Sequence, residues 1–165
     1  MERPTVRTGN KDAPRVIRPA TIAATILLFE DCADDAFFMQ RAMKAAGIKS
    51  PLQVVHHGRM AVDYLSGTGN YADRNKYPFP SLVLLDPKLP YILGLDVLKW
   101  IRGHNHLQLL PVVVLTASAE RLDLERAYRA GVNSFMVKPS ADDLDAFARC
   151  IVDYWFTHSL LPAVA

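Results

Sequence analysis

The stretch SLVLLDPKLPYILGLDVL, Ser81 to Leu98, contains an apolar run that ends on an acid, Asp86, followed directly by a proline, Pro87. An unbroken run of bulky apolar residues is typical of a strand buried on both faces of a parallel sheet. A carboxylate at the end of such a strand is costly to bury unless another group pairs with it. The stretch therefore predicts a buried strand that delivers Asp86 to a site with a charged partner.

Similar apolar runs recur along the chain and alternate with helical patterns. The predicted strands are Ile26–Phe29, Leu52–Val55, Leu82–Leu85, Val112–Leu115 and Ser134–Val137. The predicted helices are Asp35–Ala46, Met60–Leu65, a segment through Leu95 and Ile101, Leu122–Ala130, and a last helix that begins at Ser140 and reaches Trp155. Gly47 and Gly131 are placed to end two of them, and Ser140 with Asp143 is placed to cap the last. This alternation predicts an α/β fold, a doubly wound parallel sheet.

Composition places the chain among globular proteins with one core. It has 165 residues, of which 50% are hydrophobic and 22% charged. We predict a flexible basic extension over residues 1–22, a folded domain over 23–158 and an apolar C-terminal tail over 159–165. A net charge of +2, concentrated in the extension, argues against a dedicated DNA-binding protein. No apolar run approaches the roughly 18 residues that span a bilayer, so we expect no membrane segment. The two cysteines, Cys32 and Cys150, make no disulfide framework, so we expect a reduced, cytoplasmic protein.

Charged and polar residues follow the strands at one edge of the predicted sheet. Because the carboxyl ends of parallel strands share an edge, we expect the following residues to lie together: Glu30, Asp31, Asp86, Thr116 and Lys138. Three carboxylates repel one another, and Lys138 offsets one of their charges. A hard divalent cation would offset the other two, so the sequence predicts a Mg²⁺ site. His56 and His57 end the second strand and are expected to be surface residues.

Four motifs in order resemble the response-regulator receiver domain of two-component signalling. They are ILLFEDCADD, LVLLDPKLP, VVVLTAS and FMVKP, the last of which ends on the Lys138–Pro139 pair. The loop GNYADRNKYPFP and the segments AYRAGVNSFMVKP and DYWF further resemble the stand-alone regulators of phytochrome-type histidine kinases. The resemblance implies a flavodoxin-like (βα)5 fold with strand order 2-1-3-4-5. It also implies a sensor histidine kinase as partner and signalling by protein contacts, not conventional enzymatic turnover.

The resemblance assigns a role to each residue of the edge. Asp86 matches the phosphoryl acceptor, and Lys138 matches the lysine that pairs with the phosphoryl group. The Lys138–Pro139 peptide bond is implied to be cis. The Mg²⁺ ligands are implied to be Glu30, Asp31, Asp86 and the backbone carbonyl of Lys88. Thr116 matches the switch hydroxyl, and Phe135 the aromatic ring that moves with it. The backbone amides of Lys88 and Ala117 are implied to donate to the phosphoryl oxygens.

Three departures from the family pattern keep other functions open. Cys32 replaces an acid, Pro87 follows the acceptor, and Leu93 replaces the acid before Gly94. A receiver-like binding module that works without phosphate is therefore the alternative. A related aspartyl-phosphate hydrolase is disfavoured, because Lys88 stands where its second acid would be. We also expect the last helix and the apolar tail to mediate homodimerisation, since an exposed apolar surface is typical of an interface.

Overall fold

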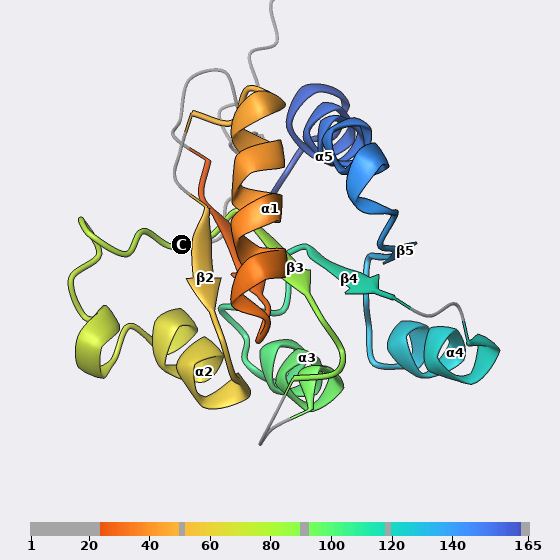
Figure 1. Ribbon diagram of the computed structural model, residues 1–165. Coiled ribbons are helices and arrows are strands. Elements are labelled where there is room, and N and C mark those ends of the chain that lie inside the picture. Colours follow the sequence, from red (N-terminus) through yellow and green to blue (C-terminus); the bar gives the residue numbers. More distant parts are fainter. Residues whose placement is uncertain (1–23, 50–51, 90–92, 118–119, 163–165) are drawn as a thin grey trace, which may run out of the picture.

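The computed structural model describes residues 24–49, 52–89, 93–117 and 120–162. Five parallel strands form one sheet in the order β2-β1-β3-β4-β5, as predicted (Figure 1). The strands are β1 (Ile26–Phe29), β2 (Gln53–Val55), β3 (Leu82–Leu85), β4 (Val112–Thr116) and β5 (Ser134–Val137). The predicted strand segments are therefore confirmed to within one residue at each end.

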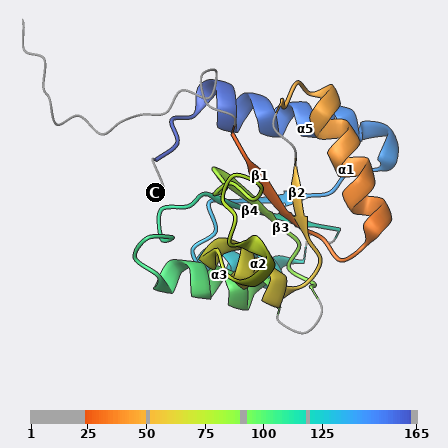
Figure 2. The same cartoon turned by 90° about the vertical axis from the view of Figure 1, so that its left-hand side faces the viewer.

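Two layers of helices cover the sheet. Helices α1 (Ala33–Ala45) and α5 (Leu144–Val152) lie on one face, and α2 (Gly58–Ser66), α3 (Gly94–Gly103) and α4 (Arg121–Arg129) lie on the other (Figures 1 and 2). Side chains alternate along each strand, so Leu27 and Phe29 pack toward α2 and α3, while Ile26 and Leu28 pack toward α1 and α5. Both faces are buried, which explains why the strands read as continuous apolar runs.

The helix ends follow the sequence in two places and depart from it in one. Gly47 and Gly131 follow α1 and α4 with φ of 93° and 91°, a conformation that glycine adopts without steric cost. The predicted Ser140 cap was wrong: the Ser140 hydroxyl donates to the Asp143 carboxylate at 3.1 Å and makes no cap to the backbone. Residues Ala141–Asp143 form a 3₁₀ turn, η2, before α5 begins.

The chain continues past α5 as a π-helical segment, η3 (Asp153–His158), and returns to the core at Leu161. Leu161 is buried with Trp155 and Phe156 against the α1 and α5 face, whereas Leu160 is 66% exposed. Part of the apolar tail therefore packs on its own domain. Residues 1–22 lie outside the described part, so the predicted flexible extension and the domain division stay predictions. In the described ranges, no helix has the length and apolar character that spanning a membrane requires.

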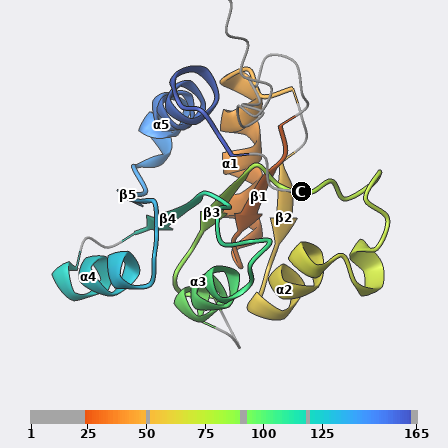
Figure 3. The ribbon, with the colours of Figure 1, turned by 180° about the vertical axis from the view of Figure 1, so that it is seen from behind.

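The connection between α2 and β3 contains a short 3₁₀ helix, η1 (Gly69–Tyr71), and is held by one arginine. Arg74 donates to the Tyr64 and Leu65 carbonyls at the end of α2, at 2.8 and 2.9 Å. Its guanidinium also lies over the Tyr64 and Phe79 rings. Figure 3 shows this segment at the β2 side of the sheet, away from α4 and β5. It is therefore a packed part of the domain that does not reach the other edge.

Candidate phosphoryl-acceptor site

The carboxyl edge of the sheet brings Glu30, Asp86 and Lys138 into direct contact. Each residue directly follows a strand, and backbone hydrogen bonds extend the sheet to hold it there. The Glu30 amide donates to Val55 O at 3.0 Å, the Asp86 amide to Phe29 O at 3.1 Å, and the Lys138 amide to Thr116 O at 2.7 Å. The positions of these side chains are thus set by the strand register and not by flexible loops.

Lys138 lies between the two carboxylates. Its Nζ is 2.5 Å from Glu30 Oε2 and 2.8 Å from Asp86 Oδ2. The side chains of Glu30, Asp86 and Lys138 are 4%, 14% and 17% exposed, so their charges are poorly solvated. Such a group is stable only when its charges are paired. Lys138 is therefore the charged partner that the sequence predicts for Asp86.

Burial and pairing act in opposite directions on this cluster. Burial raises the pKa of Glu30, and the hydrogen bond and charge of Lys138 only partly counter it. Burial alone would lower the pKa of Lys138, but its hydrogen bonds to Asp86 and Glu30 outweigh burial and raise that pKa above 10.5. Lys138 is therefore an ammonium at neutral pH, and the pair of carboxylates carries one more charge than it can offset.

The turn after β3 holds the Asp86 carboxylate in place. Asp86 Oδ1 accepts a hydrogen bond from the Lys88 amide at 2.8 Å, so its two oxygens are held by two different donors. Gly94, at the start of α3, lies so close that a Cβ there would be 2.4 Å from the Asp86 carbonyl oxygen and 2.9 Å from Pro87 Cα. Only glycine fits, and its amide donates to the Pro87 carbonyl at 3.2 Å. Replacing the preceding acid by Leu93 leaves this close packing intact.

Thr116 and Phe135 lie where the sequence places them. Thr116 ends β4, is 2% exposed and pairs in register with Val137. Phe135 is on β5 opposite Val114 and packs, partly buried, against the α2 and α3 core. The two residues therefore lie on neighbouring strands, and Lys138 directly follows the strand that carries Phe135.

The expected four-ligand metal set is only partly assembled. Among the described residues, Lys138 pairs with Glu30, Asp86 and Asp35, and Asp31 is an exposed residue outside that group. No three acid, imidazole or thiol side chains in the described ranges converge as metal ligands do. Lys138 occupies the space between the acids. The donor chemistry still fits a hard divalent cation, because two poorly solvated carboxylates share a single ammonium.

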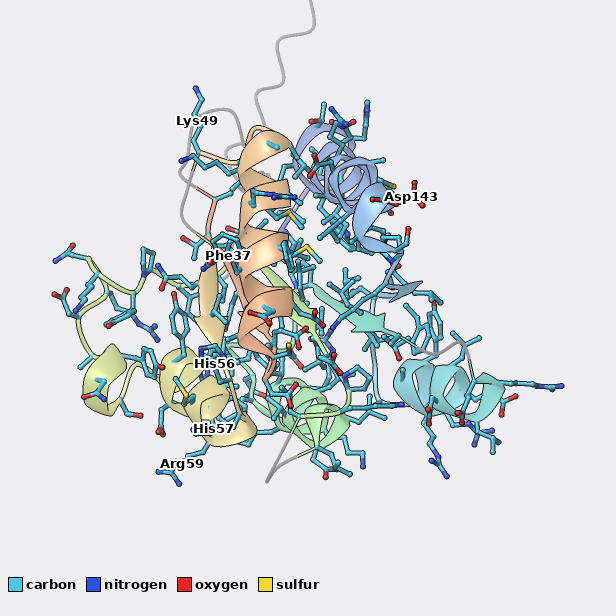
Figure 4. The ribbon with its side chains drawn as sticks, viewed as in Figure 1. Phe37, Lys49, His56, His57, Arg59 and Asp143 are labelled. Atoms are coloured by element: carbon cyan, nitrogen blue, oxygen red, sulfur yellow. The ribbon has the colours of Figure 1, made fainter. Side chains whose placement is uncertain are left out.

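The structure corrects one geometric expectation and adds two contacts. No peptide bond in the described part is cis, so the expected cis Lys138–Pro139 bond was wrong; trans is the more stable isomer before proline. His57 caps α2, its Nδ1 accepting from the Met60 amide at 3.2 Å. His56 is exposed, as expected, and its Nδ1–H donates to the Glu30 carbonyl at 2.8 Å. Figure 4 shows both histidines where β2 meets α2.

Comparison with known proteins agrees with this geometry. The family model of the response regulator receiver domain matches residues 26–148. The chain belongs to the response regulator receiver family. It is 37% identical over 144 residues to the probable methanogenesis regulatory protein FilR2 of Methanothrix harundinacea, covering 85% of this chain and 88% of that protein.

Two further relatives are regulators with solved structures. Rcp1 of Synechocystis is 34% identical over 139 residues, 84% of this chain and 92% of that protein. A structure of the Mn²⁺-bound form of Rcp1 superposes with a TM-score of 0.76 over 85% of this chain and 99% of that one, at 33% identity. The phosphorylated cyanobacterial phytochrome response regulator RcpA gives 0.78 with 30% identity and the same coverage. The predicted family, its phytochrome-associated relatives and the fold are therefore confirmed for this receiver domain.

Asp35 is the residue that sequence reasoning missed. It lies in the first turn of α1, and its Oδ2 is 3.8 Å from Lys138 Nζ. The available signal was its place at the start of the helix predicted to follow Asp31. The sequence offered no sign that Asp35, and not Asp34, would face the lysine.

Proposed function

We propose that this receiver domain accepts a phosphoryl group on Asp86 from a sensor histidine kinase in a Mg²⁺-dependent reaction. The observation that carries the proposal is the Asp86 carboxylate, held at the end of a buried strand by Lys138 on one oxygen and the Lys88 amide on the other. That arrangement fixes a carboxylate nucleophile beside a cation, which is the central requirement of phosphoryl transfer.

The transfer is balanced in atoms and charge. An Asp86 oxygen forms the new P–O bond while the P–N bond of a phosphohistidine breaks, and the imidazole leaves with the electron pair and takes up a proton. Lys138 and the Lys88 and Ala117 amides offer donors to the phosphoryl oxygens. Mg²⁺, when bound, neutralises charge on those oxygens. The residues that would hold it are Glu30, Asp31, Asp86 and the Lys88 carbonyl.

The signalling output depends on Thr116, which ends β4, and on Lys138, which directly follows β5. Phosphorylation adds charge beside both residues, Thr116 shifts toward it, and Phe135 moves in response. Converting a mostly inactive population into a mostly active one requires roughly 5 kcal/mol of differential stabilisation. A phosphoryl group that makes a few charge-assisted hydrogen bonds supplies energy of that order. The face of α4, β5 and α5 then changes its protein partners.

The kinase would approach along α1. Phe37 and Phe38 are 60% and 40% exposed, pack edge-to-face, and lie in the helix that follows Glu30 and Asp31. The Arg41 guanidinium lies 5.6 Å from the Phe38 ring centroid. Figure 4 labels Phe37 on α1. Several relatives are phytochrome response regulators, which favours a phytochrome-type kinase as the donor.

Homodimerisation through the last helix and tail remains part of this proposal. Tyr154 and Leu160 are 57% and 66% exposed at the C-terminal end of the described chain and offer apolar surface to a second copy. Light scattering at tens of micromolar checks it. A mass that fits a dimer for the wild type and a monomer for Leu160→Asp supports the interface, and a wild-type monomer removes it.

The first experiment is intact-mass analysis after incubation with a small phosphodonor, with and without Mg²⁺. We expect a phosphate adduct on the wild type only with Mg²⁺ and complete loss in Asp86→Asn. Asp96→Asn is the matched control, because it removes the same charge from the exposed surface of α3 and should keep the adduct.

A failure of this experiment has a definite meaning. If neither a small donor nor a histidine kinase phosphorylates the wild type, the phosphoryl-acceptor function is wrong. The chain would then be a receiver-like module that binds its partner without phosphate, the function that Cys32, Pro87 and Leu93 leave open. Adducts on Asp86→Asn would instead place the acceptor elsewhere.

A further inference from the structure

Lys138 has a third acidic neighbour that none of the assigned roles includes. Asp35 Oδ2 lies 3.8 Å from Lys138 Nζ, beyond the two close contacts to Glu30 and Asp86. The Asp35 side chain is 56% exposed, whereas the other two acids are almost enclosed. Asp35 therefore contacts the lysine from the solvent side of the cluster.

The backbone fixes both partners of this contact. Asp35 is in the first turn of α1, where the next residue, Ala36, and then Met39 are each 4% exposed and anchor the helix to the sheet. Lys138 is anchored by its backbone hydrogen bond to Thr116. The contact thus links α1 to β5 and does not depend on a mobile loop.

We propose that Asp35 is a positioning residue that shares the charge of Lys138, so that Glu30 and Asp86 are able to bind a divalent cation without leaving the ammonium unpaired. This inference rests on the proposed cation site. It concerns the lysine that now lies between the two acids, and it assigns Asp35 no direct contact with the cation.

The physical basis is competition for the same two carboxylates. A divalent cation and Lys138 are both positive, and each is stabilised by Glu30 and Asp86. If those acids were the only partners of Lys138, binding the cation would leave a poorly solvated ammonium with too little compensation, which is costly. Asp35 lowers that cost. Because it is already half in water, it requires little additional desolvation to take a larger share of the charge.

A plain surface acid is the competing explanation. Any carboxylate near the site attracts a cation through space, and such attraction is screened by salt. Asp34 supplies the matched control, since it has the same charge, lies in the same first turn of α1 and is also exposed. The described residues include no ion pair between Asp34 and Lys138, whose acidic partners there are Glu30, Asp35 and Asp86.

The test measures the affinity of the protein for Mn²⁺ alone, by electron paramagnetic resonance of the free ion, at 0.15 M and 1 M KCl. We expect Asp35→Asn to weaken Mn²⁺ binding about fivefold at both salt concentrations, as for loss of a short-range contact. Asp34→Asn should change the affinity by less than about twofold, and 1 M KCl should remove that change. Asp35→Glu, which keeps the carboxylate, should restore most of the affinity.

A double-mutant cycle shows whether Asp35 acts through the lysine. In a Lys138→Met background, we expect Asp35→Asn to change Mn²⁺ affinity no more than Asp34→Asn does. A fivefold loss that persists without Lys138 overturns the proposal, because Asp35 would then act on the cation itself. If Lys138→Met does not fold, the comparison of Asp35→Asn with Asp34→Asn and Asp35→Glu decides the proposal without it.

Different results would contradict the proposed cation site and the proposed role of Asp35. If the wild type binds no Mn²⁺, the proposed cation site is wrong and this inference falls with it. If the wild type binds Mn²⁺ and the Asp34 and Asp35 variants behave alike, the cation site stands and the role of Asp35 is overturned.

Discussion

Lys138 and Arg102 are partly buried cations at opposite edges of the sheet, and they differ in their partners. Lys138 follows β5 at the carboxyl edge, and its ammonium forms ion pairs with Glu30, Asp35 and Asp86. Arg102, near the end of α3, reaches the amino ends of β4 and β5. It donates at 2.8 to 3.2 Å to neutral oxygens, those of Gly131, Gln108, Leu110 and Asn133.

The surroundings of the two cations shift their pKa values in opposite directions. Burial lowers the pKa of Arg102, and no carboxylate in the described ranges forms an ion pair with it. Carboxylates raise the pKa of Lys138 despite its burial. Arg102 therefore satisfies backbone carbonyls and joins loops, whereas Lys138 belongs to a cluster with unbalanced negative charge. Arg102 is satisfied by the neutral oxygens around it, whereas Lys138, in the function proposed above, is held where further charge arrives.

Arg102→Met should have the largest effect on the free energy of unfolding. Arg102→Met keeps the apolar stem but leaves the carbonyls of Gly131, Gln108 and Leu110 without this donor, while Asn133 Oδ1 keeps its hydrogen bond from the Val112 amide. Each unsatisfied buried group costs about 1–3 kcal/mol. Because some of these oxygens are reached by water, we expect a total loss of about 3 kcal/mol in the free energy of unfolding. Urea denaturation measures it, and the folded fraction should still take up a phosphoryl group on Asp86.

Arg121→Met is the control for that variant. Arg121 is exposed on α4 and makes one ion pair to Glu125 four residues later, which is worth about 0.3–0.5 kcal/mol. Equal losses for the two arginine variants would show that Arg102 is not the structural link between α3 and the strand ends.

Lys138→Met should lower the free energy of unfolding by less than Arg102→Met does, and Mg²⁺ should restore the lost stability. Lys138→Met leaves two close carboxylates without their ammonium, which costs about 3–5 kcal/mol in a fully buried pair. Because Asp86 is still partly reached by water, we expect a smaller loss, about 2 kcal/mol, at pH 7 without divalent cations. Mg²⁺ should restore stability, because a ligand that binds only the folded state at 100 times its Kd adds about 2.7 kcal/mol. Thermal unfolding with and without Mg²⁺ provides the measurement.

Arg102→Met tests the specificity of that rescue. Mg²⁺ should stabilise Arg102→Met no more than the wild type, since no acidic cluster surrounds Arg102. Rescue of both variants to the same extent, or of neither, would contradict the distinction between the two cations.

The difference between the two edges also explains what the sequence could predict. Glu30, Asp86, Thr116 and Lys138 directly follow apolar runs, and parallel strands bring such positions to one edge whatever the loops do. The role of Arg102 has no such signal, because most of its acceptors are backbone carbonyls, which no residue type marks in the sequence. Asp35 was missed because the rotation of α1 about its axis is set by packing of Ala36 and Met39, not by the charge pattern. The capping role of His57 has no sequence signal, because capping depends on where α2 begins.

The smallest effect is a pH dependence that originates in Glu30. Burial raises its pKa above 4.5 in the folded state, so the folded protein binds the proton more tightly than the unfolded chain does. Ionised Glu30 therefore costs stability at neutral pH, and that cost disappears as the pH falls through the folded pKa toward 4.5. The stability contribution of Lys138 is lost only as the pH rises through its own pKa, above 10.5, so it does not affect this window.

Glu30→Gln removes the titrating group and keeps its shape. We expect its stability relative to the wild type to increase from pH 4 to pH 7, measured by urea denaturation at each pH. In a Lys138→Met background the increase should be larger, because the hydrogen bond and charge that lower the pKa of Glu30 are lost. In an Arg102→Met background it should be unchanged, since the two edges share no partner. A relative stability that falls between pH 4 and pH 7 would mean that Lys138 outweighs burial at Glu30, and the carboxyl edge would then be a balanced ion pair with no excess charge for a cation to meet.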